Sequence, residues 1–329
     1  MHSQWRPDLF TPADWQGAWR AVPALVLPLG YGLMTGQLLP AMVVTGAAFS
    51  VGFGSFRASG RMRWQIMAAV TSGLMLAAFA GSLLGHSLAL TVLAAAALAA
   101  LCGALSLYHQ NWWWSVLQLV IAFVLASYYP NDLAGAAERA GLVAIGGLAQ
   151  IVLVGLGLWL CPDHNPPVAA APMPVPDRWL TASYAARSAM AVALAMFIAR
   201  ASGLQHDYWA PMTAMLILKP GLLATRTRGL ARLTGTLAGS LAATVFALLS
   251  ALSGPAMLTA IAGAAYGAYT FRAAHYAVLS FFITATVVLM LDLVHGHALA
   301  NAGQRVVATL LGGGIALLSA LALPRAARP

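Results

Sequence analysis

The sequence has little charge for its length. Only 8% of its 329 residues are Asp, Glu, Lys or Arg, whereas 61% are hydrophobic. In a soluble globular domain about a quarter of the residues are charged, because charge covers the surface that faces water. The composition therefore excludes a cytosolic enzyme, a disordered tail, a coiled coil and a nucleic-acid-binding protein, in spite of the formal net charge of +9. It indicates a polytopic membrane protein.

Cysteine is also scarce, and catalytic motifs are missing. Cys102 and Cys161 are the two cysteines, and they are not spaced as a zinc-binding or redox pair. The sequence contains no zinc-protease helix, nucleophile elbow or phosphate-binding loop. We therefore expect no disulfide framework, no metal and no cofactor, and we interpret the close group Asp292, His295 and His297 as a polar turn.

Long runs without a charged residue are abundant, by contrast. A membrane-spanning helix needs about 20 predominantly apolar residues. The charge-free runs are 21–56, 64–131, 140–162, 233–271, 273–291 and 306–324. With a span near 182–201 and a short one near 207–220, they predict an all-α protein of about twelve transmembrane helices.

The predicted helices form two parallel six-helix repeats, because an even number of spans gives both halves the same orientation in the membrane. The segments that we expect are an interfacial N-terminal helix in 1–20, a first repeat in 21–162, a Pro-rich cytoplasmic linker in 163–179, a second repeat in 180–324 and a basic tail in 325–329. Thr11, Pro12 and Asp14 are interpreted as the cap and first turn of the interfacial helix.

Two local matches between the halves support a duplication. In the first, Glu138, Arg139, Gly146 and Gly147 have the same spacing as Gln304, Arg305, Gly312 and Gly313. In the second, Pro40 with Met42 resembles Pro211 with Met212.

The basic residues predict the orientation. With the N-terminus in the cytoplasm, 14 of the 17 basic residues fall on the inner side, and only Arg139, Arg200 and Arg305 fall outside. Because cytoplasmic loops of membrane proteins are rich in Arg and Lys, we expect both termini to be cytoplasmic.

The short span between Asp207 and Lys219 is the first candidate site. Pro211 interrupts it, and short or broken segments at matching places in two repeats indicate a transport site. Tyr208 and Trp209 at its start are therefore candidates for binding the substrate. The alternative is a tilted peripheral helix with these two side chains at the membrane interface. The run Trp112–Trp114 is likewise expected to be an interfacial belt, with stacking on an aromatic substrate as the alternative.

Four basic residues are candidates for binding an anion. Arg139 and Arg305 are each placed at the start of the last helix of their repeat, on the outer side of the membrane. There a guanidinium group and the helix N-terminus together favour binding of a carboxylate. Arg232 shares a face with two glycines and is expected to point into the bundle. Lys219 is placed at the cytoplasmic end of the short span. The alternative for Arg139, Arg305 and Lys219 is a side chain that reaches to the lipid headgroups.

Three residues are candidates for proton coupling. Asp292 closes an apolar span, where partial burial favours proton exchange near neutral pH. Glu138 is the candidate in the other half, unless it only pairs with Arg139. His275 is the third, with a packing role as the alternative.

The second half carries a resemblance to a known family. Its elements are the run from Tyr208 to Thr213, Leu218–Lys219–Pro220, the run from Arg232 to Gly239, the apolar run from Tyr276 to Leu291, and Arg305 to Gly313. These residues resemble the fusaric acid resistance protein-like family, which includes aromatic carboxylic acid efflux pumps and is related to plant aluminium-activated malate transporters. The resemblance covers most of 182–323, and the first half is similar only in layout.

The resemblance implies a transporter in the bacterial inner membrane that exports small organic anions, with aromatic carboxylic acids as the expected substrate class. The basic residues independently imply an anion. The expected partners are the substrate and membrane lipid, without nucleic acid; a periplasmic adaptor protein and a homodimer are left open. The alternatives are an organic-anion channel, a membrane enzyme that uses Asp292, His295 and His297, and an assembly subunit.

Overall fold

The computed structural model describes residues 9–163, 176–249, 253–296 and 298–321. Most of the predicted linker 163–179 and all of the predicted tail 325–329 lie outside these residues. The described residues form helices and no strand. In chain order the helices are α1 (Trp15–Ala21), α2 (Pro23–Thr35), α3 (Leu38–Gly54), α4 (Gly60–Leu84), α5 (Leu88–Tyr108), α6 (Gln110–Ser127), α7 (Leu133–Leu160), α8 (Arg178–Ala201), α9 (Trp209–Ile217), α10 (Leu222–Leu249), α11 (Gly254–Thr270), α12 (Tyr276–His295) and α13 (Ala298–Leu321).

Seven of these helices are long and apolar enough to cross a membrane. They are α4, α5, α7, α8, α10, α12 and the part of α13 from Ala302 to Leu321. The chain is therefore a polytopic membrane protein. The predicted number of twelve membrane-crossing helices stays a prediction, because α2, α3, α6, α9 and α11 are shorter.

Capping residues set the helix starts, and two predicted starts are wrong. Asp132 begins α7 by accepting a hydrogen bond from Gly135 N at 2.8 Å, so that the helix starts well before residue 140. Asp14 begins α1 by accepting one from Gly17 N at 2.8 Å, so that Thr11 and Pro12 precede the helix. A side-chain oxygen at the N-cap satisfies an amide of the first turn that has no partner within the helix.

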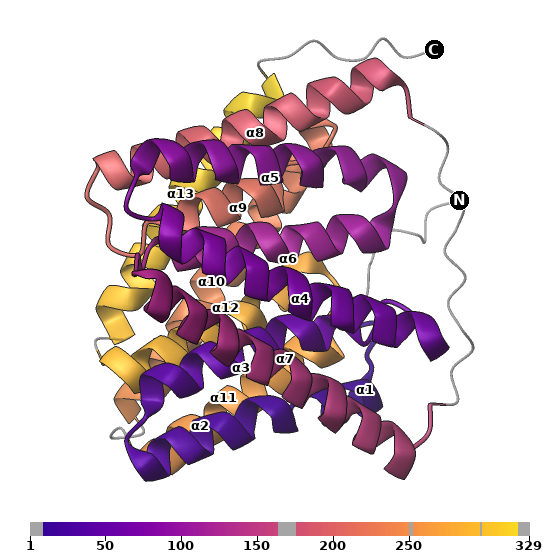
Figure 1. Cartoon of the computed structure of the whole chain (residues 1–329), viewed down its shortest axis with the longest axis vertical. Helices are drawn as coiled ribbons and strands as arrows, with labels where there is room; N and C mark the ends of the chain where they lie inside the picture. The colour runs from indigo at the N-terminus through magenta and orange to yellow at the C-terminus, as the bar shows by residue number, and fades with distance from the viewer. Residues whose placement is uncertain (1–8, 164–175, 250–252, 297, 322–329) are drawn as a thin grey trace.

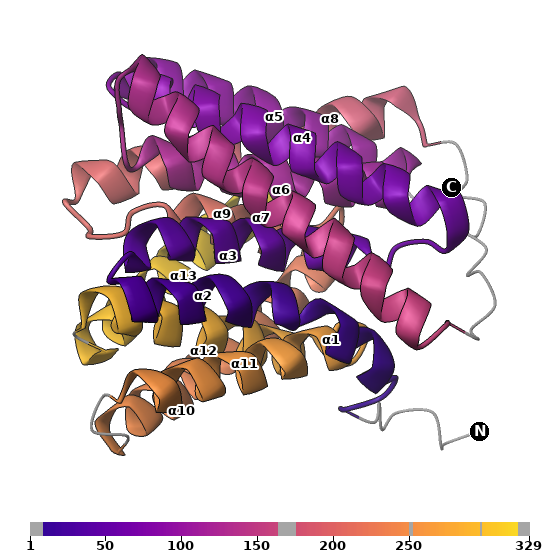
Figure 2. The same ribbon diagram turned by 60° about the horizontal axis from the view of Figure 1, so that its bottom comes forward.

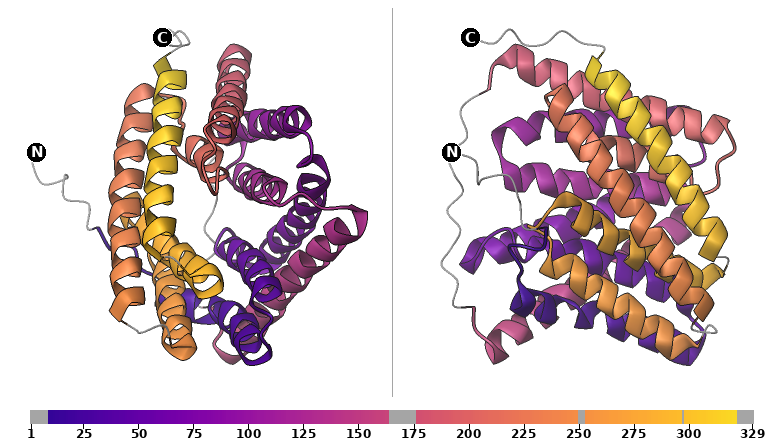
Figure 3. Two further views of the ribbon diagram at one scale, coloured as in Figure 1. Left: turned by 90° about the vertical axis from the view of Figure 1, so that its left-hand side faces the viewer. Right: turned by 180° about the vertical axis from the view of Figure 1, so that it is seen from behind.

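The packing of α2–α7 recurs in α8–α13. In the first half α4 packs on α6 and α7, and α3 packs on α7. In the second half α10 packs on α12 and α13, and α9 packs on α13. Figure 3 shows α10 and α13 side by side. Each pair in one half thus has a counterpart six helices along the chain.

The two halves contact each other through corresponding helices. α5 packs along α8 (Figure 1), and the counterpart of this pair is the contact of α11 with α2. In Figure 2, α2 lies between α3 and α11. On one side of the interface, α5 of the first half lies beside α8, the first helix of the second half. On the other side, α11 of the second half lies beside α2, the first helix of the first half.

Close glycine contacts give the register between the halves. A Cβ atom on Gly146 would collide with the backbone oxygen of Val44, and one on Gly312 with that of Ala210. Both pairs are related by a shift of 166 residues, as are the helix starts at Leu88 and Gly254. Each of these glycines therefore stands where another helix approaches closely. The resemblance of Pro40 to Pro211 does not follow this register.

We predict that Gly312→Ala destabilises the protein and that Gly314→Ala does not. The added methyl group at Gly312 meets the α9 backbone, and overpacking of this kind costs about 1–3 kcal/mol. A Cβ at Gly314, on the same helix, meets nothing within 4 Å, and alanine favours a helix. Thermal unfolding of both variants in detergent checks this. Equal unfolding midpoints for the two variants would contradict the close contact of Gly312 with α9.

Candidate functional site

α9 is a short helix in the interior of the bundle. Its nine residues are about 14 Å long, well below the hydrocarbon thickness of about 30 Å. Trp209 to Met215 and Ile217 are buried, and α9 packs on α6, α8, α10 and α13. The interpretation as a peripheral helix is therefore wrong. Tyr208 and Trp209, which begin this segment, are 2% and 8% exposed rather than interfacial.

Arg305 stacks on Trp209 at the first residue of α9. Its Cζ atom lies 3.8 Å from the centroid of the Trp209 ring, and the residue is 2% exposed. Its Nε and Nη1 atoms are buried without a hydrogen-bond partner among the described residues. Because an unsatisfied buried donor is costly, these two atoms are free to bind an acceptor that enters the site.

A row of aromatic rings connects Arg305 with Arg139. From the Arg305 side, successive ring centroids are 4.7 Å apart for Trp209 and Tyr208, 5.2 Å for Tyr208 and Tyr128, and 4.8 Å for Tyr128 and Tyr129. The Arg139 guanidinium then lies 5.8 Å from the Tyr129 ring. The structure thus joins the two repeated arginines through aromatic side chains of both halves.

Arg139 differs from Arg305 in its hydrogen bonds. Its Nη1 atom donates to Ser82 Oγ at 2.6 Å and to Tyr129 O at 2.5 Å. These bonds tie α7 to the end of α4 and to the loop after α6. The side chain that was predicted to bind an anion therefore already uses one of its nitrogens to hold helices together.

Neither arginine lies at a helix N-terminus, so the predicted helix-terminus site is wrong. α7 begins at Leu133 and α13 at Ala298, which places Arg139 and Arg305 in the second turn. The favourable effect of the helix dipole is confined to the first turn.

Arg232 points into the bundle, as expected from its face of α10. It is 4% exposed, and its Nε atom has no hydrogen-bond partner among the described residues. On the same face α12 approaches closely, since a Cβ on Gly235 would lie 2.6 Å from Ser280 Cβ. Arg305 of α13 is buried as well, at 2% exposed, and α10 packs on α13. Two packed helices of the second half thus each carry a buried guanidinium group.

Buried hydroxyl groups lie beyond Arg232, and the sequence interpretation missed them. Each of these residues is buried, and its hydroxyl oxygen has no hydrogen-bond partner among the described residues. They are Thr236, Ser240 and Thr244 of α10 and Ser280 and Thr284 of α12. The four-residue spacing on each helix was the available signal, because it places the hydroxyls on one face. Buried polar atoms are normally hydrogen-bonded, so this face offers a ligand or water several partners.

Lys219 lies at the opposite end of α9. Its Nζ atom is 4.7 Å from the Trp113 ring centroid. One tryptophan of the predicted interfacial belt therefore packs against the Lys219 ammonium group. Burial, and then the positive charge of Arg228, lower the pKa of Lys219 to about 8. Cationic groups therefore lie at both ends of α9.

Sequence comparison identifies a relationship for this half of the chain. Residues 194–319 match the fusaric acid resistance protein-like family. A 166-residue stretch is 30% identical to the inner membrane protein YccS of Escherichia coli (strain K12), over 47% of this chain and 23% of that protein. The aligned chain thus spans about a quarter of that relative. No solved structure matches.

The family match confirms the resemblance expected from the sequence. It includes α9, α10 and most of α13, and therefore Tyr208, Trp209, Arg232 and Arg305. Arg139 lies outside it. That relative is by its name an inner membrane protein, whereas the inner-membrane location of this chain and the orientation of its termini stay predictions.

The three proton-coupling candidates differ in their surroundings. Asp292 is 4% exposed near the end of α12, and Glu138 is exposed on α7. His275 caps α12, since its Nδ1 atom accepts a hydrogen bond from Ala277 N at 3.3 Å. Burial favours Asp292 among the three, and a capping bond gives His275 a structural role. Proton coupling stays a prediction for all three.

A further acidic residue, Asp207, lies in the loop before α9. Its Oδ2 atom pairs with Arg200 Nε at 3.1 Å. Burial raises the pKa of Asp207 more than Arg200 lowers it. Arg200 also donates to Ser127 O at 3.0 Å, so that this pair anchors the loop before α9.

A metal site would need several ligands close together. Among the described residues, no group of three His, Cys, Asp or Glu is arranged for one. His297, which belongs to the group with Asp292 and His295, lies outside the described residues.

We predict a pH dependence of stability that depends on Lys219. Its pKa is about 8 in the folded protein and 10.5 as a free side chain, so the unfolded chain binds more protons between these values. The free energy of unfolding should therefore rise as the pH rises through this range. Lys219→Gln should raise the midpoint of thermal unfolding by roughly 2–4 °C near pH 7.5.

The same variant should lose most of this advantage near pH 9.5, where Lys219 is largely neutral. Thermal unfolding in detergent at the two pH values measures the difference. A difference that does not change with pH would contradict the lowered pKa.

Proposed function

We propose that the chain forms the transport unit of an inner-membrane exporter of small organic anions, with aromatic carboxylates as the substrate class. The observation that carries the proposal is Arg305 stacked on Trp209, with two buried donors unoccupied. A guanidinium group can hold a carboxylate through paired N–H donors. The adjacent aromatic rings provide apolar faces against which an aromatic acid can pack.

The architecture of the exporter is two parallel repeats of six membrane-crossing helices. The recurrent packing of α2–α7 and α8–α13 supports this proposal, as does the shift of 166 residues between equivalent glycine contacts. In such proteins the substrate site lies near the middle of the membrane, where broken helices contribute to it. α9 is the broken helix of the second repeat.

The path of the anion follows α9. Lys219 attracts the carboxylate from the cytoplasmic side, Arg232 and the hydroxyl groups of α10 and α12 hold it on the way, and Arg305 receives it beside Trp209. An inside-negative membrane potential favours the exit of an anion by about 2.3 kcal/mol per charge per 100 mV. Proton exchange through Asp292 is therefore an addition that the energetics do not require.

We predict that Arg305→Gln lowers export of an aromatic acid such as benzoate at least about ten-fold, the loss expected for a charge-assisted hydrogen bond. Arg226→Gln is the matched control, because it also removes one positive charge but Arg226 is exposed. Flux of radiolabelled acid from proteoliposomes under an imposed potential measures the effect. Equal losses in the two variants would reject the anion path.

Saturation of the same flux distinguishes the exporter from a channel. An exporter has a low, saturable turnover, whereas a channel gives single-channel currents. Either result keeps the role of Arg305, because both routes must stabilise the anion in the interior.

A further inference from the structure

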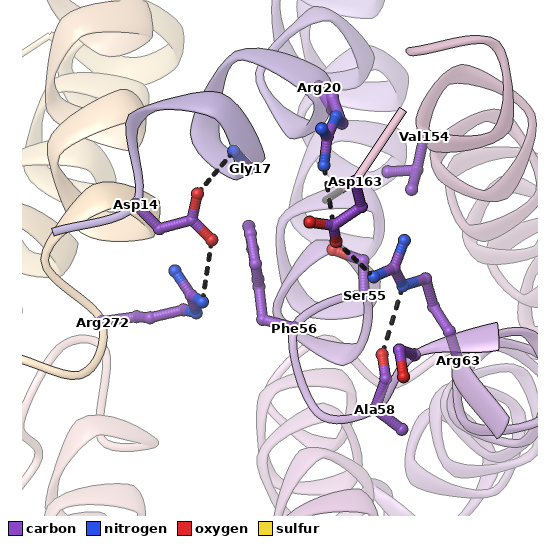
Figure 4. Close-up of a pocket in the computed structure, with 11 residues that line it drawn as sticks. Asp14, Gly17, Arg20, Ser55, Phe56, Ala58, Arg63, Val154, Asp163 and Arg272 are labelled. Atoms are coloured by element: carbon purple, nitrogen blue, oxygen red, sulfur yellow. Dashed lines mark hydrogen bonds and ion pairs between the residues drawn. The ribbon is translucent and has the colours of Figure 1, made fainter. Parts of the chain in front are cut away.

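A pocket of about 340 Å³ lies at the end of the bundle that is predicted to face the cytoplasm. α1, the turn between α3 and α4, the end of α7 and the turn between α11 and α12 form it (Figure 4). A volume of this size is typical of small-ligand sites. We call it the α1 pocket and define it by Asp14, Arg20, Phe56, Arg63, Asp163 and Arg272.

Two guanidinium groups in the α1 pocket converge on one oxygen. Arg63 Nη2 donates to Asp163 Oδ2 at 2.9 Å, and Arg20 Nη1 lies 3.7 Å from the same atom. Figure 4 shows the carboxylate between the two side chains. Because the arginines come from α4 and α1, the fold itself builds this position for a negatively charged oxygen.

Positive charge in the pocket exceeds negative charge. The lining carries three guanidinium groups against the carboxylates of Asp14 and Asp163. The Nε atom of Arg20 is buried without a hydrogen-bond partner among the described residues. Burial, and then the positive charge of Arg272, lower the pKa of nearby Arg57 to about 10. One more negative charge would therefore be stabilised here.

The pocket also has an apolar wall and lies beside the predicted membrane interface. Arg272 Cζ is 3.9 Å from the Phe56 ring centroid, and its Nη2 atom pairs with Asp14 at 3.0 Å. On α1, Trp15 and Trp19 are 54% and 69% exposed, as expected for side chains at the level of the lipid headgroups. Basic pockets at this level of a membrane protein are suited to phosphate headgroups.

We propose that the α1 pocket binds a phosphate-type oxyanion, which takes the place of the Asp163 carboxylate between Arg20 and Arg63. Arginine presents paired donors that match phosphate oxygens. The Asp163 carboxylate then competes with the oxyanion for the position between the two arginines. The source of the oxyanion is inorganic phosphate or the headgroup of an anionic phospholipid. The pocket is separate from Arg305, and the proposal does not depend on the transport of any substrate.

The test measures binding of inorganic phosphate to the purified full chain in neutral detergent, by calorimetry at constant ionic strength. Arg63→Gln should weaken binding at least about ten-fold, because it removes a charged donor. Asp163→Asn should strengthen it about ten-fold, because it removes the competing charge. Arg61→Gln is the control, since Arg61 is exposed on the same helix and does not line the pocket.

The two sources are distinguished with short-chain phosphatidylglycerol, with phosphatidylcholine as the neutral control. Phosphatidylglycerol that binds with the same dependence on Arg63 and Asp163, and displaces phosphate, identifies a lipid headgroup. Phosphate that binds and is not displaced identifies the free ion. Both results support the proposal.

The proposal is overturned if neither phosphate nor phosphatidylglycerol binds, if potassium chloride alone gives the same heat, or if Asp163→Asn binds no tighter than the unmodified chain. A gain in affinity cannot arise from misfolding, so Asp163→Asn remains informative if Arg63→Gln fails to fold. In that case Arg63→Lys replaces it, and retained charge without the paired donors should still weaken binding.

Discussion

The burial of guanidinium groups in an apolar bundle is the constraint on which the rest of the structure depends. A charge in such surroundings is costly unless other groups compensate it. Arg305 and Arg232 are nevertheless 2% and 4% exposed. The ring of Trp209 covers one face of Arg305, and α9 must therefore begin in the interior. A helix of nine residues surrounded by four others meets this requirement, whereas a full membrane-crossing helix would place Trp209 near the interface.

Features that depend on local sequence could be predicted. The membrane class follows from apolar runs, and the helix divisions follow from the polar and glycine-rich breaks between them. The inward position of Arg232 follows from Gly235 and Gly239 on its face, because small residues allow α12 to approach. The starts of α1 and α7 were wrong for an equally local reason. For α7 the charged Arg139 was taken as the helix start, and for α1 Thr11 and Pro12 were taken as part of the cap and first turn. The capping bonds of Asp132 and Asp14 decide where these helices begin.

Contacts between distant residues could not be predicted from one sequence. The pair of Arg63 with Asp163 joins residues 100 positions apart, and that of Arg272 with Asp14 joins residues 258 apart. The sequence interpretation placed all four on the same side of the membrane, which is necessary for these pairs but leaves their partners undetermined. The same limit applies to Lys219 and Trp113, which only the packing of α6 near α9 brings together.

The two repeated arginines show how one register can support different roles. Arg139 and Arg305 each precede, by the same number of residues, a glycine at which another helix approaches closely, so the two arginines occupy equivalent positions in α7 and α13. Around Arg139 the first half supplies oxygen acceptors from Ser82 and Tyr129, so that its guanidinium group joins α7 to the end of α4 and to the loop after α6. Around Arg305 the second half supplies an aromatic ring, which compensates part of the charge but accepts no conventional hydrogen bond. Arg305 Nε and Nη1 therefore remain without a partner among the described residues, whereas Arg139 Nη1 is used to hold helices of the first half together.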